Sequence, residues 1–173
     1  FGGASGRFDG NGDYLNVPDS DDWDFGTGDF TIDCWFYMTA NDRRLLYRGA
    51  AALWSIYIGD SGTFDYVTVS FKLSDDSRTS KQFNFESPRI TLNAWHHLAF
   101  VRSGSNGYMF VDGVQGVTGW GDFTGTLKDG SDGITIGSEA GGGYYWFGWI
   151  DEFRISKGIA RWWIDFTPPE RPY

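Results

Sequence analysis

The sequence is poor in cysteine, histidine and long apolar runs, and each shortage excludes a kind of protein. Among 173 residues there is one cysteine, Cys34, so no internal disulfide can form. Cys34 falls within an apolar alternation, which predicts a buried, inert thiol. No stretch approaches the roughly 18–20 apolar residues of a membrane-spanning helix. No signal peptide is visible, and a chain that starts at Phe1 is typical of a processed or excised module.

Positive charge is also scarce. Fourteen lysines and arginines face 23 aspartates and glutamates, which gives a net charge of −9 and a pI near 4.5. Binding to a nucleic-acid backbone needs a basic stripe, so this partner is excluded. An acidic surface keeps a protein soluble, and aspartates in its loops suit Ca²⁺.

Arrangements typical of catalytic sites are missing. The four glutamates are scattered, with no two at the i, i+2 or i, i+4 spacing of glycosidase strands. There is no Gly-x-Ser-x-Gly elbow, and no glycine-rich loop is placed between a strand and a helix. His96 and His97 are neighbours on a predicted strand, where they point to opposite faces and cannot share a metal. We therefore expect a protein that is not an enzyme; the alternative is a pair of aspartates that different loops bring together.

What the sequence does contain is aromatic residues, at 19%, and 25 glycines. This composition favours many short strands joined by tight turns. Apolar and polar residues alternate along several of them, which is typical of antiparallel sheets with one buried face. Strands are predicted at residues 7–8, 14–17, 28–38, 45–48, 53–58, 66–73, 81–85, 95–102, 108–111, 133–137 and 146–156. So many short strands in one domain predict an all-β, two-sheet antiparallel sandwich over residues 1–173.

Between the strands, Asp112-Gly113 predicts a hairpin turn. Helix is confined at most to one turn at 159–164, and residues 167–173 form a C-terminal tail.

Trp162 and Trp163 are adjacent, so one of the two rings is expected to face outward toward a partner. The alternative is that this segment packs over the convex sheet.

The last predicted strand contains a carboxylate among apolar residues. Alternation places Trp149, Asp151, Phe153 and Ile155 on one face. If that face is the core, Asp151 points inward at its rim. Burying a bare carboxylate costs several kcal/mol or more, so Asp151 needs a cation, an ion pair or hydrogen bonds from a turn.

Five segments together resemble a known family. They are FDGNGDYL at 8–15, FTIDCWF at 30–36, WHHLAFVR at 95–102, MFVDG at 109–113 and GWIDEFRI at 148–155. In this order and spacing they resemble laminin-G-like, concanavalin A-like jelly-roll domains, and the ending FTPP at 166–169 is common in them. The resemblance implies two stacked antiparallel sheets, one concave, with the first and last strands adjacent. It does not specify a function, because this scaffold carries lectins, glucanases, adhesion domains and virion parts.

The resemblance also implies a structural Ca²⁺ near the junction of the first and last strands. Asp151 occupies the matching place, and Asp9, Gly10 and Asn11 of the first turn would supply further oxygens. The alternative is that Asp151 accepts hydrogen bonds from backbone N–H groups of that turn.

The best candidates for ligand binding are aromatic residues in glycine-rich loops, because sugars present C–H faces that stack on aromatic rings. Trp120 with Asp122 lies in one such loop, and Tyr144 with Tyr145 in another. Asp42 and Arg44 belong to a third polar loop that the topology would bring close. The alternative is that Trp120 and Trp146 pack across the sandwich edges and Tyr144 covers a neighbouring loop.

From these features we expect a non-catalytic carbohydrate-binding or adhesion module. It would attach to a cell-surface or extracellular polysaccharide as part of a larger or multimeric surface protein. Stacking by Tyr144, Tyr145 or Trp120 would hold the sugar, and Arg44, Asp42 and Asp122 would give specificity. The rival is a structural or protein-interaction domain of a phage virion or a bacterial adhesin. Both functions place the protein outside the cell, on its surface or in a virion.

Overall fold

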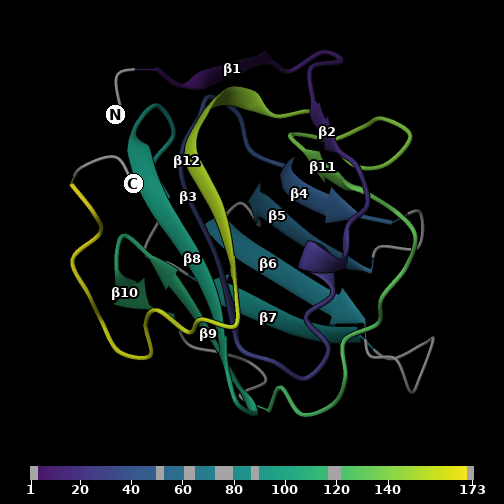
Figure 1. Cartoon of the computed structure of the whole chain (residues 1–173). Coiled ribbons are helices and arrows are strands. Elements are labelled where there is room, and N and C mark those ends of the chain that lie inside the picture. Colours follow the sequence, from purple (N-terminus) through teal and green to yellow (C-terminus); the bar gives the residue numbers. More distant parts are fainter. Residues whose placement is uncertain are drawn as a thin grey trace.

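Two antiparallel sheets face each other in this computed structural model (Figure 1). It describes residues 4–49, 53–60, 65–72, 80–86, 90–116 and 122–170. The first sheet, called here the β3 sheet, has the order β1-β12-β3-β8-β9-β10. The second, the β5 sheet, has the order β2-β11-β4-β5-β6-β7. The predicted β-sandwich is therefore confirmed.

The strands match the predicted ranges closely. Those of the β3 sheet are β1 (Gly6–Asp9), β3 (Phe30–Met38), β8 (Trp95–Ser103), β9 (Asn106–Val111), β10 (Val114–Gln115) and β12 (Phe147–Lys157). Those of the β5 sheet are β2 (Leu15–Val17), β4 (Arg43–Arg48), β5 (Trp54–Asp60), β6 (Asp65–Lys72), β7 (Ser80–Glu86) and β11 (Ile134–Ile136). The sequence did not reveal the short β10 or the 3-10 turn η1 (Asp21–Trp23). The predicted hairpin at Asp112-Gly113 is confirmed, because both residues have positive φ and Val111 pairs with Val114.

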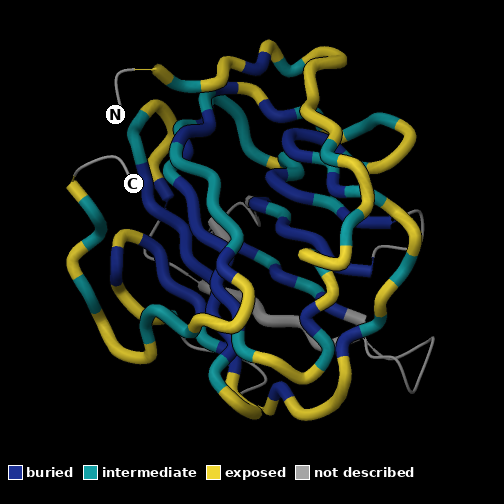
Figure 2. The backbone as a smooth tube through the Cα atoms, viewed as in Figure 1, coloured by how far each residue is buried: buried dark blue, intermediate teal, exposed yellow. Residues whose placement is uncertain are grey.

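The core lies between the sheets, whose strands carry the buried positions in Figure 2, and it combines aliphatic with aromatic side chains. On β3, alternate side chains point inward and are at most 1% exposed: Phe30, Ile32, Cys34, Phe36 and Met38. The rings of Phe30, Phe71, Phe100 and Phe123 meet at centroid distances of 5.0 to 6.3 Å. Burial raises the pKa of the Cys34 thiol far above its ordinary value, and the Asp33 charge raises it further. Cys34 is thus the inert core residue that the alternation predicts.

A β-bulge in β12 corrects the predicted face of Asp151. Asp151 pairs with Trp35, and the next aligned pair is Arg154 with Asp33, so two residues of β12 face one of β3. The extra residue reverses the alternation. Asp151 therefore lies on the outer face of the β3 sheet beside Trp35, while Phe153 and Ile155 pack against the core. Glu152 adopts φ 51° at the bulge, and the Asp151 carboxylate accepts its N–H at 2.9 Å.

The chain after β12 covers part of the outer face of the β3 sheet. Trp162 and Phe166 stack at 4.1 Å, and both rings meet His97 edge-on at 5.8 Å. No helical turn forms at 159–164. The hydroxyl of Thr31 instead bonds the carbonyl of Ile159 and the N–H of Arg161, so these backbone groups are bound to the sheet. Packing over the sheet is thus confirmed for Trp162, whereas Trp163 is 57% exposed.

Candidate functional site

The predicted residue Arg44 lies at the centre of an aromatic cluster on the outer face of the β5 sheet. Arg44 of β4 pairs with Tyr57 of β5, and the next strand positions on these two strands point into the core. The guanidinium carbon of Arg44 lies 4.9 Å from the ring centre of Tyr57, 5.5 Å from that of Tyr47 and 5.8 Å from that of Tyr144. Planar guanidinium groups bind well to aromatic faces, so these contacts hold Arg44 in one position.

Hydrogen bonds fix the same cluster from its edges. Nη2 of Arg44 lies 3.4 Å from the Glu139 carboxylate, and Nη1 lies 3.4 Å from the hydroxyl of Ser55. The backbone N–H of Arg44 donates to the carbonyl of Tyr144 at 2.9 Å. The loop that carries Glu139 and Tyr144 is therefore attached to β4 through both backbone and side chains.

Asp42 and the two tyrosines complete this arrangement. The phenol of Tyr57 donates to the Asp42 carboxylate at 2.7 Å, and the rings of Tyr57 and Tyr144 meet edge to face at 5.8 Å. Asp42 has φ 59° and Tyr144 has φ 47°, a region that residues other than glycine seldom adopt. Backbone strain of this kind tends to gather at functional sites, and here it occurs in both loops beside Arg44.

The glycine-rich loop 137–146 is held at its base and presents its tip to solvent. The N–H of Trp146 donates to the carbonyl of Gly137 at 2.7 Å, and the Trp146 ring is fully buried against Phe36. The packing alternative is thus confirmed for Trp146. Tyr144 is 50% exposed and Tyr145 is half-buried. The loop therefore offers two tyrosines on a base fixed in the core.

A pocket of about 370 Å³ opens between this loop and the first strands of the β5 sheet. Hydroxyl, amide, carboxylate and phenol groups line it. The lining residues are Tyr14, Asn16, Thr135, Ser138, Glu139, Ala140, Gly141, Gly142 and Tyr145. Glu139 belongs both to this pocket and to the Arg44 cluster, so the two features form one site. Pockets of a few hundred cubic ångströms with a few convergent polar groups are typical of small-ligand sites.

Four of the six predicted ligand-binding residues meet here, and one described residue, Asp122, does not. Asp42, Arg44, Tyr144 and Tyr145 lie in this site. Asp122 accepts the N–H of Thr124 at 2.9 Å, next to Phe123, whose N–H donates to Ser105 in the β8–β9 turn, so it lies apart. Trp120 lies outside the described residues.

Sequence reasoning missed several members of the site. Tyr57 carried a usable signal, because alternation along 54–58 places it opposite the core residues. No such signal pointed to the other four residues, which are Tyr14, Asn16, Thr135 and Glu139. Only the pairing of β2 with β11 and the fold of the 137–146 loop bring them together.

The residues expected to bind calcium do not form one coordination shell. Asp9 pairs with Phe147, which is four residues along β12 from Asp151, or roughly 13 Å at the usual rise per residue. The Asp9 carboxylate accepts the N–H of Asn11 at 2.7 Å, with Gly10 at φ 79° between them. No group of three or more histidines, cysteines or acidic residues in the described ranges is placed to hold a metal. The chain therefore does not fit a calcium ion shared by Asp151 and the first turn.

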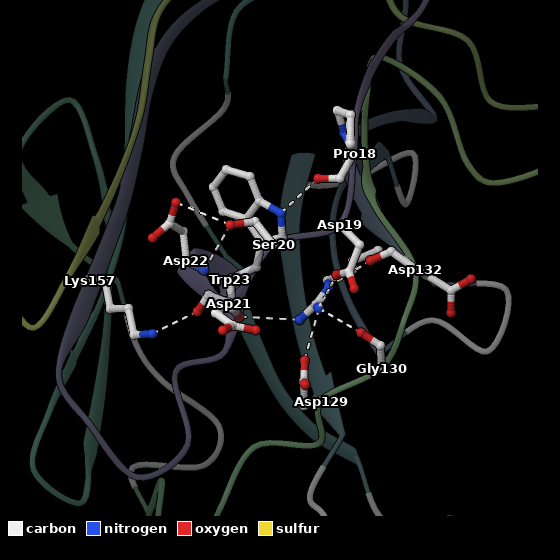
Figure 3. Close-up of polar contacts among 11 residues, drawn as sticks. Pro18, Asp19, Ser20, Asp21, Asp22, Trp23, Asp129, Gly130, Asp132 and Lys157 are labelled. Carbon is white, nitrogen blue, oxygen red and sulfur yellow. Dashed lines mark hydrogen bonds and ion pairs between the residues drawn. The ribbon is translucent and has the colours of Figure 1, made fainter.

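Residues of the 18–24 and 129–132 segments surround one guanidinium group (Figure 3), and this group belongs to the buried Arg48. Arg48 is 1% exposed and donates to five oxygens at 2.9 to 3.2 Å. These belong to the carboxylates of Asp19 and Asp129 and to the carbonyls of Trp23, Gly130 and Asp132. Because Arg48 joins the 18–24 and 129–132 segments, we assign it a structural role.

The outer face of the β3 sheet carries a second aromatic group. Tyr37 of β3 is flanked across the strands by Trp149 at 5.0 Å and Trp95 at 5.8 Å, both edge-on. Asp151 lies one row below and is 8% exposed, with one carboxylate oxygen that has no hydrogen-bond partner among the described residues.

Comparisons with known proteins agree with the fold. Residues 9–160 match the sequence profile of a family described as the concanavalin A-like lectin/glucanases superfamily. No curated protein matches the sequence significantly. In the described part of the chain, no helix is long and apolar enough to cross a membrane.

Several solved structures share the architecture at low sequence identity. A putative carbohydrate-binding protein from Bacteroides ovatus is 18% identical, with a TM-score of 0.65 over 91% of this chain and 44% of its own. Domains LG4-5 of the mouse laminin alpha1 chain are 16% identical, with a TM-score of 0.66 over 95% of this chain and 46% of theirs. Domain 4 of an extracellular arabinanase from Geobacillus stearothermophilus, in complex with arabinotriose, is 17% identical, with a TM-score of 0.61 over 92% of this chain and 78% of its own. The chain thus spans less than half the length of the first two.

Proposed function

Because the chain belongs to the concanavalin A-like lectin/glucanases superfamily, we propose that it is a non-catalytic carbohydrate-binding module. Its site is the outer face of the β5 sheet around Arg44 and loop 137–146. The observation that carries this proposal is the set of tyrosines held around Arg44 beside a polar pocket.

The chemistry of the site suits a sugar. The C–H faces of a pyranose or furanose ring stack on aromatic rings, and Tyr144 and Tyr14 are 50% and 53% exposed. Sugar hydroxyls need donors and acceptors at fixed positions, which Asn16, Thr135 and Glu139 supply in the pocket. Arg44 orients the tyrosines and Glu139, so the site is organised before a ligand arrives.

Two of the similar structures support this choice of ligand. One is named as a putative carbohydrate-binding protein, and another holds arabinotriose. We propose the same general role here, in attachment to a cell-surface or extracellular polysaccharide by a protein outside the cell. A single shallow site would bind in the millimolar to micromolar range, about −4 to −8 kcal/mol, and would gain strength through multivalency.

A glycan array followed by calorimetric titration tests the proposal. We expect saturable binding of at least one glycan, which Tyr144→Ala weakens by at least fivefold. Trp163→Ala removes an aromatic residue of similar exposure elsewhere and should leave binding unchanged. The proposal fails if no glycan binds, or if both substitutions weaken binding equally.

A second candidate is a structural or protein-interaction domain of a virion or adhesin. It is favoured by Trp163 and Ile164, which are 57% and 67% exposed on the C-terminal segment, and by Val114 of β10, which is 57% exposed. The N–H of Gln115 donates to Asp165 at 2.8 Å, so β10 and this segment lie side by side. Self-association that Trp163→Ser abolishes, without any glycan binding, would support this role instead.

A further inference from the structure

We infer that the β5 sheet selects uncharged glycan chains and discriminates against uronic, sialic or sulfated ones. The inference rests on the proposed function and adds the class of glycan. It comes from the distribution of charge and hydrogen-bonding groups over the outer face of this sheet.

An uncharged row of side chains crosses this face. The strand registers align Asn16 of β2 with Thr135 of β11, Tyr47 of β4, Ser55 of β5 and Ser70 of β6. Five strands spaced about 4.8 Å apart give the row a length of roughly 19 Å. Ser55 is buried beneath Arg44, and the amide, hydroxyl and phenol groups of the other members can donate to or accept from sugar hydroxyls without favouring a charged substituent.

The cation beside this row, Arg44, is already engaged by other groups of the protein. Arg44 is paired with the pocket residue Glu139 at 3.4 Å, and three tyrosine rings lie against its guanidinium. Among the described pocket residues none is cationic, and the single charged group is the Glu139 carboxylate. A carboxylate or sulfate on the ligand would therefore approach a negative group, within a chain of net charge −9.

The size of this preference follows from the repulsion between the Glu139 carboxylate and an acidic group on the ligand. Two like charges in close contact repel each other, and they do so more strongly where water is partly excluded. We therefore expect neutral ligands to bind roughly tenfold tighter than acidic ones of the same size. Since the neutral contacts are hydrogen bonds and stacking, binding of neutral glycans should change little between 0.05 and 0.5 M NaCl.

The test is a titration of the intact chain with two matched pairs of ligands. Galactotriose is compared with trigalacturonate, and a neutral cello-oligosaccharide with its uronic counterpart. Arabinotriose and a sulfated oligosaccharide widen the panel. The inference predicts tighter binding of the neutral member whenever a pair binds.

Two substitutions should shift the preference of the chain from neutral toward acidic ligands. Glu139→Gln removes the repelling carboxylate and frees Arg44, so binding of acidic ligands should gain at least tenfold relative to neutral ones. Thr135→Lys adds a cation to the uncharged row and should shift selectivity in the same direction without disturbing Arg44. Glu170→Gln removes an exposed carboxylate on the C-terminal segment and is the matched control.

The outcomes separate the inference from the function on which it rests. Neutral selectivity that Glu139→Gln or Thr135→Lys reverses supports both. Tighter binding of the acidic members by the unmodified chain overturns the inference while the glycan-binding function stands. Absence of binding across the whole panel overturns the proposed function, and the inference with it.

Discussion

The phenol of Tyr57 donates a hydrogen bond of 2.7 Å to the carboxylate of Asp42, and the same ring lies against the guanidinium of Arg44. One tyrosine thus links a strained loop residue to the cation at the centre of the site. This link explains how the loop before β4 and the loop before β12 come to present their side chains together.

Replacing Arg44 by lysine should weaken glycan binding by about tenfold. Lysine keeps the charge but loses the planar group that contacts three tyrosine rings, a difference of about 1–2 kcal/mol. Calorimetric titration measures the loss, and Arg7→Lys on the exposed β1 is the control. Equal affinities of the Arg44→Lys and unmodified proteins would show that Arg44 does not organise the site.

Replacing Arg48 by methionine should lower the free energy of unfolding by about 2–4 kcal/mol. The five oxygens around the guanidinium lose a charged donor, and the carbonyls among them depend on it for hydrogen bonds. Urea unfolding measures the change. Arg161→Met, at a partly exposed position, should cost much less, and a loss below 1 kcal/mol for Arg48→Met would contradict the structural role.

Asp112 should make stability depend on pH in the acid range. Burial alone would raise the pKa of Asp112, but hydrogen bonds from His96 and from the His97 N–H, with the charges of both histidines, together lower it. A lowered folded-state pKa means that the contribution is present above the unfolded value near 3.9 and is lost as the pH falls below it.

The measurement is urea unfolding between pH 7 and pH 3. Asp112→Asn should flatten the acid part of the stability curve, by no more than about 1 kcal/mol because the side chain is 47% exposed. Asp165→Asn is the control. An unchanged slope below pH 4 in Asp112→Asn would refute this assignment.

Calcium should not stabilise the protein through Asp151 and the first turn. The four expected ligand residues lie in two places, so excess Ca²⁺ and EDTA should give the same Tm. At 100 times its Kd a bound ion would add about 2.7 kcal/mol, a shift of several degrees. A calcium-dependent rise in Tm that Asp151→Asn removes would show that these groups do cooperate.

The fold could be predicted from the sequence because its signals are local. Alternation along β3 and β8 sets which residues are buried, and turn residues such as Asp112-Gly113 set where strands end. The sheet face on which Asp151 lies could not be predicted. One extra residue at Glu152 reverses the alternation along β12, and the composition of this strand gives no signal for the bulge.

The candidate site was only partly predictable for a related reason. Arg44, Asp42, Tyr144 and Tyr145 carried signals of their own, as polar or aromatic residues in glycine-rich or charged loops. Glu139 and Thr135 joined them only through long-range pairing, which is a property of the assembled sheets.

Amide chemical-shift mapping tests the central claim most directly. The ¹⁵N-labelled chain is titrated with a glycan that binds it, and the perturbed residues are located in the fold. The account predicts changes confined to Asn16, Arg44, Tyr57, Thr135 and the 137–146 loop. Changes centred instead on Trp35, Tyr37, Trp95 and Trp149 of the β3 sheet would place the glycan on the opposite face and contradict it.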